Sequence, residues 1–167
     1  VLRWRRVEVS GGALLLLAAL YYLDGQGVVL PALLACALHE GGHWLAIRAL
    51  GGRVSALRLT CVGAEMRLSA RFPLGWGAQL IAALAGPCAN LLAAWAAART
   101  GTEGGYCFAG LNLALALFNL LPAAPLDGGR ALGCALALTA RLSRLDSSAL
   151  YRRAVLPAGA FFGAASV

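Results

Sequence analysis

The sequence is poor in charged residues. Only 13% of its 167 residues are charged, whereas 60% are hydrophobic and the mean hydropathy is +0.76. A soluble domain carries roughly 25% charged residues, because its water-facing surface needs them. Several apolar runs also approach the about 20 residues with which a helix crosses a bilayer. The composition therefore argues against a soluble domain and predicts an integral membrane protein in contact with the lipid bilayer.

Lysine is absent, and all 14 basic residues, which leave the chain with a net charge of +7, are arginines. They lie between the apolar runs rather than on one soluble face, so we expect no nucleic-acid partner. With the N-terminus in the cytoplasm, the arginines at 3–6, 53–71 and 141–153 fall inside and Arg99 falls outside. The positive-inside rule describes such a division. We therefore expect a multi-pass protein with a cytoplasmic N-terminus.

The sequence also lacks a CxxC pair, although it contains five cysteines. Isolated cysteines in apolar surroundings are typically small buried side chains, which is our interpretation of them. Cys36 lies one turn before His39, which leaves a minor role near that residue open. The five are Cys36, Cys61, Cys88, Cys107 and Cys134.

Apolar runs at 10–23, 27–50 and 77–98 predict membrane-spanning helices. The first run follows arginines, as in a signal peptide. It shows no small-residue cleavage site before a polar mature domain, so we expect a retained helix. The stretch 106–139 reads as one spanning element, interrupted in the middle by prolines and paired glycines. A fifth apolar run follows Arg153 and reaches the end of the sequence.

Between these runs, apolar and polar residues alternate at 53–71 around Val62-Gly63, which predicts a β-hairpin at the membrane surface. The fold class that we predict is an all-α polytopic membrane protein. It is a bundle of about five to six transmembrane helices with a short interfacial β-hairpin and one broken helix. We expect residues 1–167 to form one membrane-embedded domain with its core at about 28–140. The apolar final run suggests a truncated C-terminus.

Two histidines and a glutamate stand inside the second apolar run, in His39-Glu40-Gly41-Gly42-His43. Residues four apart share a helix face, so both imidazoles can bind one zinc ion at about 2.0–2.1 Å. Glu40 then lies beside the ion without binding it. There it can take a proton from water and later pass one to the leaving amine. This is the HExxH pattern, and it predicts one catalytic Zn²⁺ per chain.

The alternative is a helix whose histidines form structural hydrogen bonds or face lipid by accident. The chain has only two histidines, and both fall in this motif. Ionisable groups at membrane depth are costly and usually functional. The zinc site is therefore our interpretation.

A catalytic zinc site needs a third protein ligand and an open fourth position. Asp127, in Pro-Leu-Asp-Gly-Gly, is the one other carboxylate that interrupts an apolar run, since the remaining acids lie in terminal, loop or interface segments. Asp127 is thus the candidate third ligand. Its alternative role is the N-cap of the helix that follows.

Three motifs in this order resemble the site-2 protease family of intramembrane zinc metalloproteases. They are HEGGH from His39, GPCAN from Gly86 and NLLPAAPLDGG from Asn119, and the resemblance covers about residues 28–140. It implies that His39, His43 and Asp127 bind zinc, which makes the broken helix a metal-binding one, and that Glu40 is the general base.

The resemblance also implies that Asn119 lies near the site and orients substrate or the oxyanion. It places Asn90 on the helix packed against the catalytic one, and we count Asn90 as a second candidate contact to substrate. For Asn90 and for Asn112, interhelical hydrogen bonding is the alternative role.

The 51–76 segment is too short for a PDZ domain, so the chain looks most like the compact group that includes the sporulation stage IV protease. That likeness implies a bacterial or archaeal cell membrane, a membrane-tethered protein substrate such as a pro-sigma factor, and a regulatory membrane protein as partner. Some relatives also carry a C-terminal CBS domain, which would lie beyond this sequence.

The position of the motif suggests how a substrate would be reached. The histidines lie about 7 to 11 residues from the cytoplasmic helix end, or roughly 10–17 Å deep, so the site should open to the cytoplasm. A transmembrane substrate must unwind before its carbonyls can be attacked. The edge of the 53–71 hairpin can accept such an extended segment by strand addition, although a purely structural surface loop is the alternative.

Two other function classes fit parts of the pattern. A zinc transporter would also place HExxH-like clusters in helices, and it should show further ligands or proton-relay carboxylates at membrane depth. An inactive homologue would bind membrane proteins without cutting them. A prenyl-protein protease also uses HExxH, but the PLDGG element is not its signature. We prefer the intramembrane protease, because Glu40 and three ligands are present together.

Overall fold

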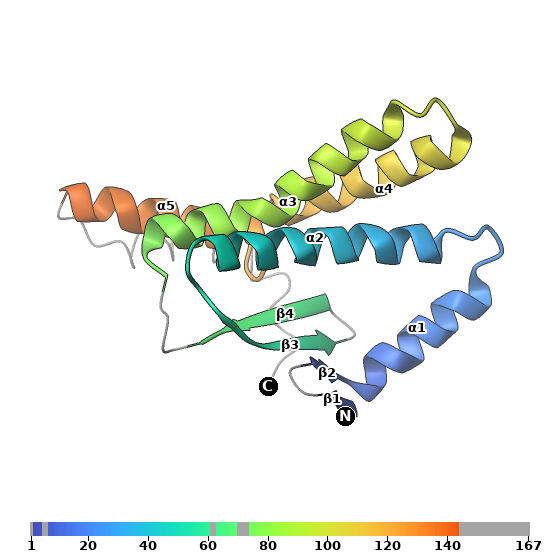
Figure 1. Ribbon diagram of the computed structural model, residues 1–167, viewed down its shortest axis with the longest axis horizontal. Coiled ribbons are helices and arrows are strands. Elements are labelled where there is room, and N and C mark those ends of the chain that lie inside the picture. Colours follow the sequence, from blue (N-terminus) through green and yellow to red (C-terminus); the bar gives the residue numbers. More distant parts are fainter. Residues whose placement is uncertain (1, 5–6, 61–62, 70–73, 144–167) are drawn as a thin grey trace.

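The computed structural model describes residues 2–4, 7–60, 63–69 and 74–143 (Figure 1). Over these residues the chain forms five helices and a four-stranded sheet. In chain order the elements are β1 (Leu2–Trp4), β2 (Val7–Val9), α1 (Gly11–Leu23), α2 (Val29–Ala49), β3 (Val54–Thr60), β4 (Gly63–Leu68), α3 (Trp76–Ala98), α4 (Glu103–Asn119) and α5 (Asp127–Ser143). The fifth apolar run and the arginines from 144 to 153 lie outside the described residues.

The helices α1, α2 and α3 confirm the three predicted helical runs within a residue or two at each end. Local chemistry explains where α2 begins. The carboxylate of Asp24 accepts hydrogen bonds from the backbone N–H groups of Val28 at 2.9 Å and Val29 at 2.8 Å. These N–H groups belong to the first turn of a helix, where they have no partner within the helix itself.

The helices α4 and α5 lie one after the other along α3, and both pack against it (Figure 1). The irregular segment 120–126 joins them and contains a cis peptide bond between Ala124 and Pro125. The prediction of one long element at 106–139, broken near its prolines, is therefore confirmed in outline. The break brings the first residue of α5 into the middle of the bundle.

The predicted hairpin is confirmed, since β3 and β4 pair antiparallel. The sheet is larger than expected, however. β2 adds to β3 in parallel and β1 pairs with β2, which produces the order β1-β2-β3-β4. Strands before residue 10 are not among the predicted elements. Three-residue strands are too short to show an alternating pattern, and β2 joins the sheet through contacts with residues about 50 positions away.

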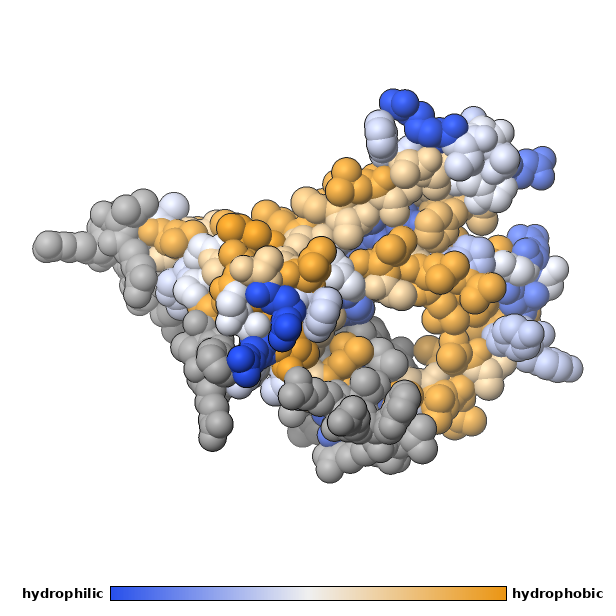
Figure 2. Space-filling view, viewed as in Figure 1, coloured by the Kyte–Doolittle hydropathy of each residue, from blue (hydrophilic) through white to orange (hydrophobic). Residues whose placement is uncertain are grey.

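Small side chains fill the centre of the helical bundle. Within the described residues the buried hydrophobic side chains are alanines, apart from Ile47 and Cys134. Large hydrophobic side chains instead face outward along all of α1 to α4, as the orange surface in Figure 2 shows. Small residues that let helix backbones approach, with large apolar residues outside, are typical of helices packed in a membrane.

The outward distribution corrects one prediction. Cys36, Cys88 and Cys107 are exposed on the helix surfaces, whereas Cys134 alone among the described cysteines is buried as expected. The error arose because apolar residues surround each cysteine in the sequence on every face of its helix. Such uniform runs do not reveal which face packs inward. Cys61 lies outside the described residues.

Among the helices of the described residues, α3 is both long enough and apolar enough to cross a bilayer by these two criteria. α1 is comparably apolar but shorter, with 13 residues. α1 stands apart from the other helices (Figure 1), and an apolar groove of about 440 Å³ separates it from the first half of α2.

Candidate metal centre

The helix α2 turns one stripe of residues toward its neighbours. Ala35, His39, His43 and Ile47 recur every four residues and are all buried, at 1 to 8% exposure. The remaining faces of α2 carry exposed leucines and Trp44. The four-residue spacing therefore brings both imidazoles to the single side of α2 that packs against α3.

Two glycines allow α2 and α3 to come this close. A Cβ on Gly42 of α2 would lie 2.7 Å from the carbonyl oxygen of Ala85 and 2.9 Å from the Cβ of Ala89. A Cβ on Gly86 of α3 would collide with the imidazole of His43. The HEGGH and GPCAN motifs are thus the two sides of one helix contact.

A third segment completes the site from the other side. Asp127 is the first residue of α5 and is 7% exposed. The two glycines that follow lie against backbone of the irregular segment, where a Cβ would meet a carbonyl group of Leu120 at Gly128 or of Ala123 at Gly129. The two glycines of the PLDGG sequence therefore let the first turn of α5 pack directly against the irregular segment 120–126.

The ligand atoms of these residues converge. Oδ2 of Asp127 lies 3.0 Å from Nε2 of His39 and 3.0 Å from Nε2 of His43, and the two Nε2 atoms are 3.1 Å apart. Protein ligands of a tetrahedral zinc ion, each bound at about 2.0–2.1 Å, are separated by roughly 3.3 Å. The spacing is close to that value.

The chemistry of the atoms also fits a cation. Nδ1 of His43 donates a hydrogen bond to the carbonyl oxygen of Ala82 at 2.7 Å, since that oxygen can only accept. The neutral imidazole then presents a lone pair at Nε2, opposite a carboxylate oxygen of Asp127. Two electron pairs that face each other require a positive charge between them. His39, His43 and Asp127 therefore fit a single zinc ion.

Glu40 and Arg130 border this cluster. Glu40 follows His39 on α2 and is half-buried, three positions from His43, so it lies on the side of the helix next to that imidazole. Arg130, 55% exposed in its side chain, places Nη1 3.8 Å from the second carboxylate oxygen of Asp127. Arg130 is not among the predicted site residues. Its signal was the i, i+3 spacing from Asp127 on a predicted helix.

The two asparagines expected near substrate occupy different surroundings. Asn119 is half-buried at the end of α4, and its Nδ2 donates to the carbonyl oxygen of Leu115 at 3.0 Å, so its role in substrate binding stays a prediction. Asn90 is completely buried behind His39, and its side-chain oxygen and nitrogen both bond to protein atoms. Its position does not support the expected contact with substrate.

Comparison with known proteins agrees with this geometry, although no family model matches the chain. A Synechocystis protein provisionally named a zinc metalloprotease is 38% identical over 103 residues, which span 56% of this chain and 27% of that protein. Rip3 of Mycobacterium tuberculosis, provisionally named in the same way, is 32% identical over 127 residues, or 72% of this chain and 30% of that protein. The chain thus spans less than a third of the length of these relatives.

The fold is similar to that of a solved structure, the site-2 protease from Methanocaldococcus jannaschii. The TM-score is 0.64 and the identity 21%, over 84% of this chain and 71% of that chain. The sequence relatives indicate a zinc metalloprotease ancestry, and the structural neighbour supplies the same helical arrangement. The chain is therefore similar in sequence to proteins named as zinc metalloproteases and similar in fold to a site-2 protease.

Proposed function

We propose that this chain is the catalytic part of an intramembrane zinc endopeptidase, which hydrolyses a peptide bond within or near a transmembrane segment of a membrane-tethered protein. One observation carries the proposal. His39, His43 and Asp127 converge their ligand atoms at 3.0–3.1 Å inside the helical bundle, with the carboxylate of Glu40 next to them on α2.

Each residue of the site has a separate role in the proposed hydrolysis. A bound zinc ion supplies a Lewis acid that polarises water and the scissile carbonyl group. Glu40 accepts the proton of the attacking water on its carboxylate and then donates it to the nitrogen of the leaving amine. His39, His43 and Asp127 would hold the ion. Arg130, at the rim, adds positive charge beside Asp127.

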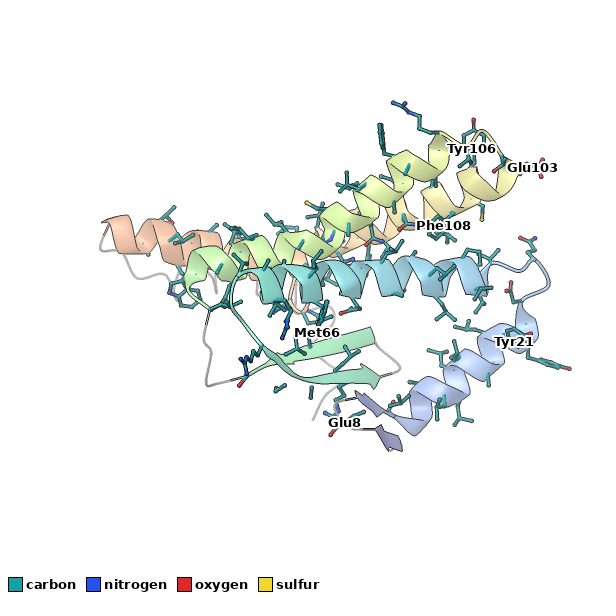
Figure 3. The ribbon with its side chains drawn as sticks, viewed as in Figure 1. Glu8, Tyr21, Met66, Glu103, Tyr106 and Phe108 are labelled. Atoms are coloured by element: carbon teal, nitrogen blue, oxygen red, sulfur yellow. The ribbon has the colours of Figure 1, made fainter. Side chains whose placement is uncertain are left out.

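The surface of the helices supports a membrane location. Exposed leucines and aromatic residues cover α1 to α4, and a soluble monomer seldom exposes apolar area on this scale. We infer that these surfaces contact lipid and that the chain makes several spans. The α3–α4 turn with Arg99 and Glu103 lies at the far end of the bundle from the sheet (Figure 3). This separation supports the proposed topology, with the sheet and N-terminus in the cytoplasm and Arg99 outside.

The edge of the sheet at β4 offers backbone groups that could pair with an extended substrate segment. β4 is the last strand in the order β1-β2-β3-β4, and Met66 lies on the side of β4 near α2 (Figure 3). The backbone N–H of Ser69 donates inward to Arg53 at 2.8 Å. Alternation along the strand then turns the N–H of Met66 outward. We propose that an unwound substrate segment pairs with this edge.

Met66→Pro tests the edge, because proline removes the outward N–H without removing a bond to β3. We expect slower cleavage with unchanged zinc content. Met66→Ala is the matched control, since it removes the side chain and keeps the N–H. Equal cleavage rates in the two variants would reject strand addition.

The test of the whole proposal compares wild type with Glu40→Gln, using purified protein and candidate membrane-tethered substrates in detergent or liposomes. We expect Glu40→Gln to retain about one zinc per chain and to lose cleavage. Glu103→Gln, at the start of α4, is the control and should cleave normally. Cleavage by Glu40→Gln at the wild-type rate would exclude Glu40 as the base. Zinc movement into proteoliposomes by both proteins would instead identify a transporter. Wild type that binds zinc and membrane proteins but cuts none would indicate an inactive homologue.

A further inference from the structure

A chain of buried hydrogen bonds reaches His39 from two other helices. Nδ1 of His39 lies 2.6 Å from Oδ1 of Asn90 on α3, and Nδ2 of Asn90 lies 2.7 Å from Oδ1 of Asn112 on α4. Asn90 and Asn112 are both completely buried, at 0% exposure. The chain therefore connects α4 through α3 to the candidate zinc ligand on α2 without access to water.

The α4 end of this series of hydrogen bonds is closed by an atom that can only accept. Nδ2 of Asn112 donates to the carbonyl oxygen of Phe108 at 2.8 Å, one turn earlier on α4. A carbonyl oxygen requires a donor, so the amide nitrogen of Asn112 must face Phe108. Its oxygen then faces Asn90 and can only accept.

Asn90 is oriented in the same way by two acceptors. Its Nδ2 donates to the carbonyl oxygen of Ala35 at 3.0 Å as well as to Oδ1 of Asn112. The NH₂ group has two hydrogens, and these two acceptors use both. Turning the amide over would place its oxygen against two other oxygens. The oxygen of Asn90 is therefore held toward His39.

The consequence falls on the tautomer of His39. Because Oδ1 of Asn90 accepts, Nδ1 of His39 must carry the hydrogen, and the lone pair of the neutral ring is left at Nε2. Nε2 is the atom that faces Asp127 and His43. The carbonyl oxygen of Ala82 imposes the same tautomer on His43. A histidine that binds a metal ion through one ring nitrogen generally has its ring orientation fixed by a hydrogen-bond partner on the other nitrogen.

We propose that Asn112 is a positioning residue for the zinc site, acting through Asn90 to hold His39 in the tautomer and orientation that bind zinc. This inference builds on the proposed zinc site, but the tautomer itself can be measured without metal. It assigns to Asn90 a place behind the ligand His39, and to Asn112 in the middle of α4 an influence on a residue 73 positions away in sequence.

The first experiment measures the tautomers directly. Protein labelled with ¹⁵N-histidine, purified through a histidine-free tag and stripped of metal, should show two imidazole spin systems at a pH where both rings are neutral. We expect both rings to carry the hydrogen on Nδ1. A hydrogen on Nε2 of His39 in the wild-type protein would overturn the relay, whatever the protein does to substrates.

The second experiment measures zinc affinity by competition with a chromogenic chelator. In Asn112→Leu the amide of Asn90 loses one of the two acceptors that orient it and leaves a buried N–H without a partner. We expect about a 10- to 100-fold weaker affinity, in the range seen for outer-shell partners of metal ligands. Asn112→Asp, protonated at this buried position, can still accept from Asn90 and donate to Phe108. We expect it to restore the affinity to within about threefold of wild type.

Gln79→Leu is the control, since it removes a side-chain bond to the carbonyl oxygen of Leu74 elsewhere on α3. It should leave zinc affinity unchanged. Wild-type zinc affinity in Asn112→Leu would overturn the positioning role, because the side chain would then have no effect on the site. An equal loss of affinity in Asn112→Leu and Asn112→Asp would also overturn it, because that result indicates an effect of packing alone. If wild type binds no zinc, the zinc site fails while the tautomer measurement still decides the relay. If Asn112→Leu does not fold, the tautomer measurement on the wild-type protein again decides whether the relay exists.

Discussion

Gly86 on α3 lies directly against the imidazole of His43, so a single methyl group there should disable the metal centre. A Cβ at this position would lie 2.6 Å from Cε1 and 2.8 Å from Cδ2 of the ring, with Nε2 closer still, whereas ordinary contact begins at 3.4 Å. The ring of His43 must then retreat by at least roughly 0.6–0.8 Å. Metal–ligand distances vary by only about 0.2 Å in functional sites.

The ring has little freedom to retreat. Nδ1 of His43 is bound to the carbonyl oxygen of Ala82, one turn before Gly86 on the same helix, so a shift of the ring strains or breaks this bond. We expect Gly86→Ala to weaken zinc binding at least 10- to 100-fold, as the loss of an outer-shell partner does, or about 1.4–2.7 kcal/mol. The proposed proteolysis should fall at least as far, because it would require the zinc ion.

The assay is chelator competition for zinc, with cleavage of a membrane-tethered substrate measured in parallel. Gly110→Ala on α4 is the matched control, because a Cβ there meets nothing within 4 Å. It should bind zinc normally and raise helix stability by up to about 1 kcal/mol. Gly86→Ala with zinc affinity within threefold of wild type and normal cleavage would refute the argument that α3 forms the wall behind His43.

Three further changes test other parts of the structure. Asp127→Asn keeps the shape of the side chain but removes the charge of the third ligand, so zinc affinity should fall at least tenfold by the same competition assay; an unchanged value would assign the third ligand elsewhere. Gly42→Ala should destabilise the protein by about 1–3 kcal/mol through overpacking against Ala85, whereas Gly41→Ala should not, since a Cβ at Gly41 meets nothing within 4 Å. Equal melting temperatures of these two variants would contradict the close α2–α3 contact. The backbone N–H groups of Val29 and Val28 lower the pKa of the Asp24 carboxyl below its ordinary 3.8, so its contribution to stability is present above that pH and lost as the pH falls through the lowered pKa. Asp24→Asn should therefore melt earlier than wild type at pH 7 and at the same temperature once Asp24 is protonated; a difference that persists at such low pH would disprove the linkage.

Several features followed from the sequence because their signals are local. The apolar runs predicted α1, α2 and α3. A helix forms its backbone hydrogen bonds within its own segment, so it needs only a continuous stretch of suitable residues. The alternation at 53–71 indicated the β3–β4 hairpin. His39 and His43 were identifiable as a pair because four-residue spacing puts both on one face of any helix. Asp127 was selected because so few acids interrupt the apolar runs.

Other features were decided by the tertiary structure alone. The strands β1 and β2 join the sheet through a parallel pairing with β3, and no short-range pattern encodes such a contact. Cys36, Cys88 and Cys107 face outward. The sequence of a uniformly apolar helix does not indicate which face its neighbours will cover, so this exposure could not be predicted.

The same division holds at the metal centre. The residue types that suit zinc were evident along the chain, because ligand chemistry belongs to each side chain. Which nitrogen each histidine presents was not, because the hydrogen on an imidazole is placed by the partner of its other nitrogen. For His43 that partner is a carbonyl of α3, and for His39 it is Asn90, itself oriented by Asn112 on α4. Such partners become neighbours only when three helices have packed together.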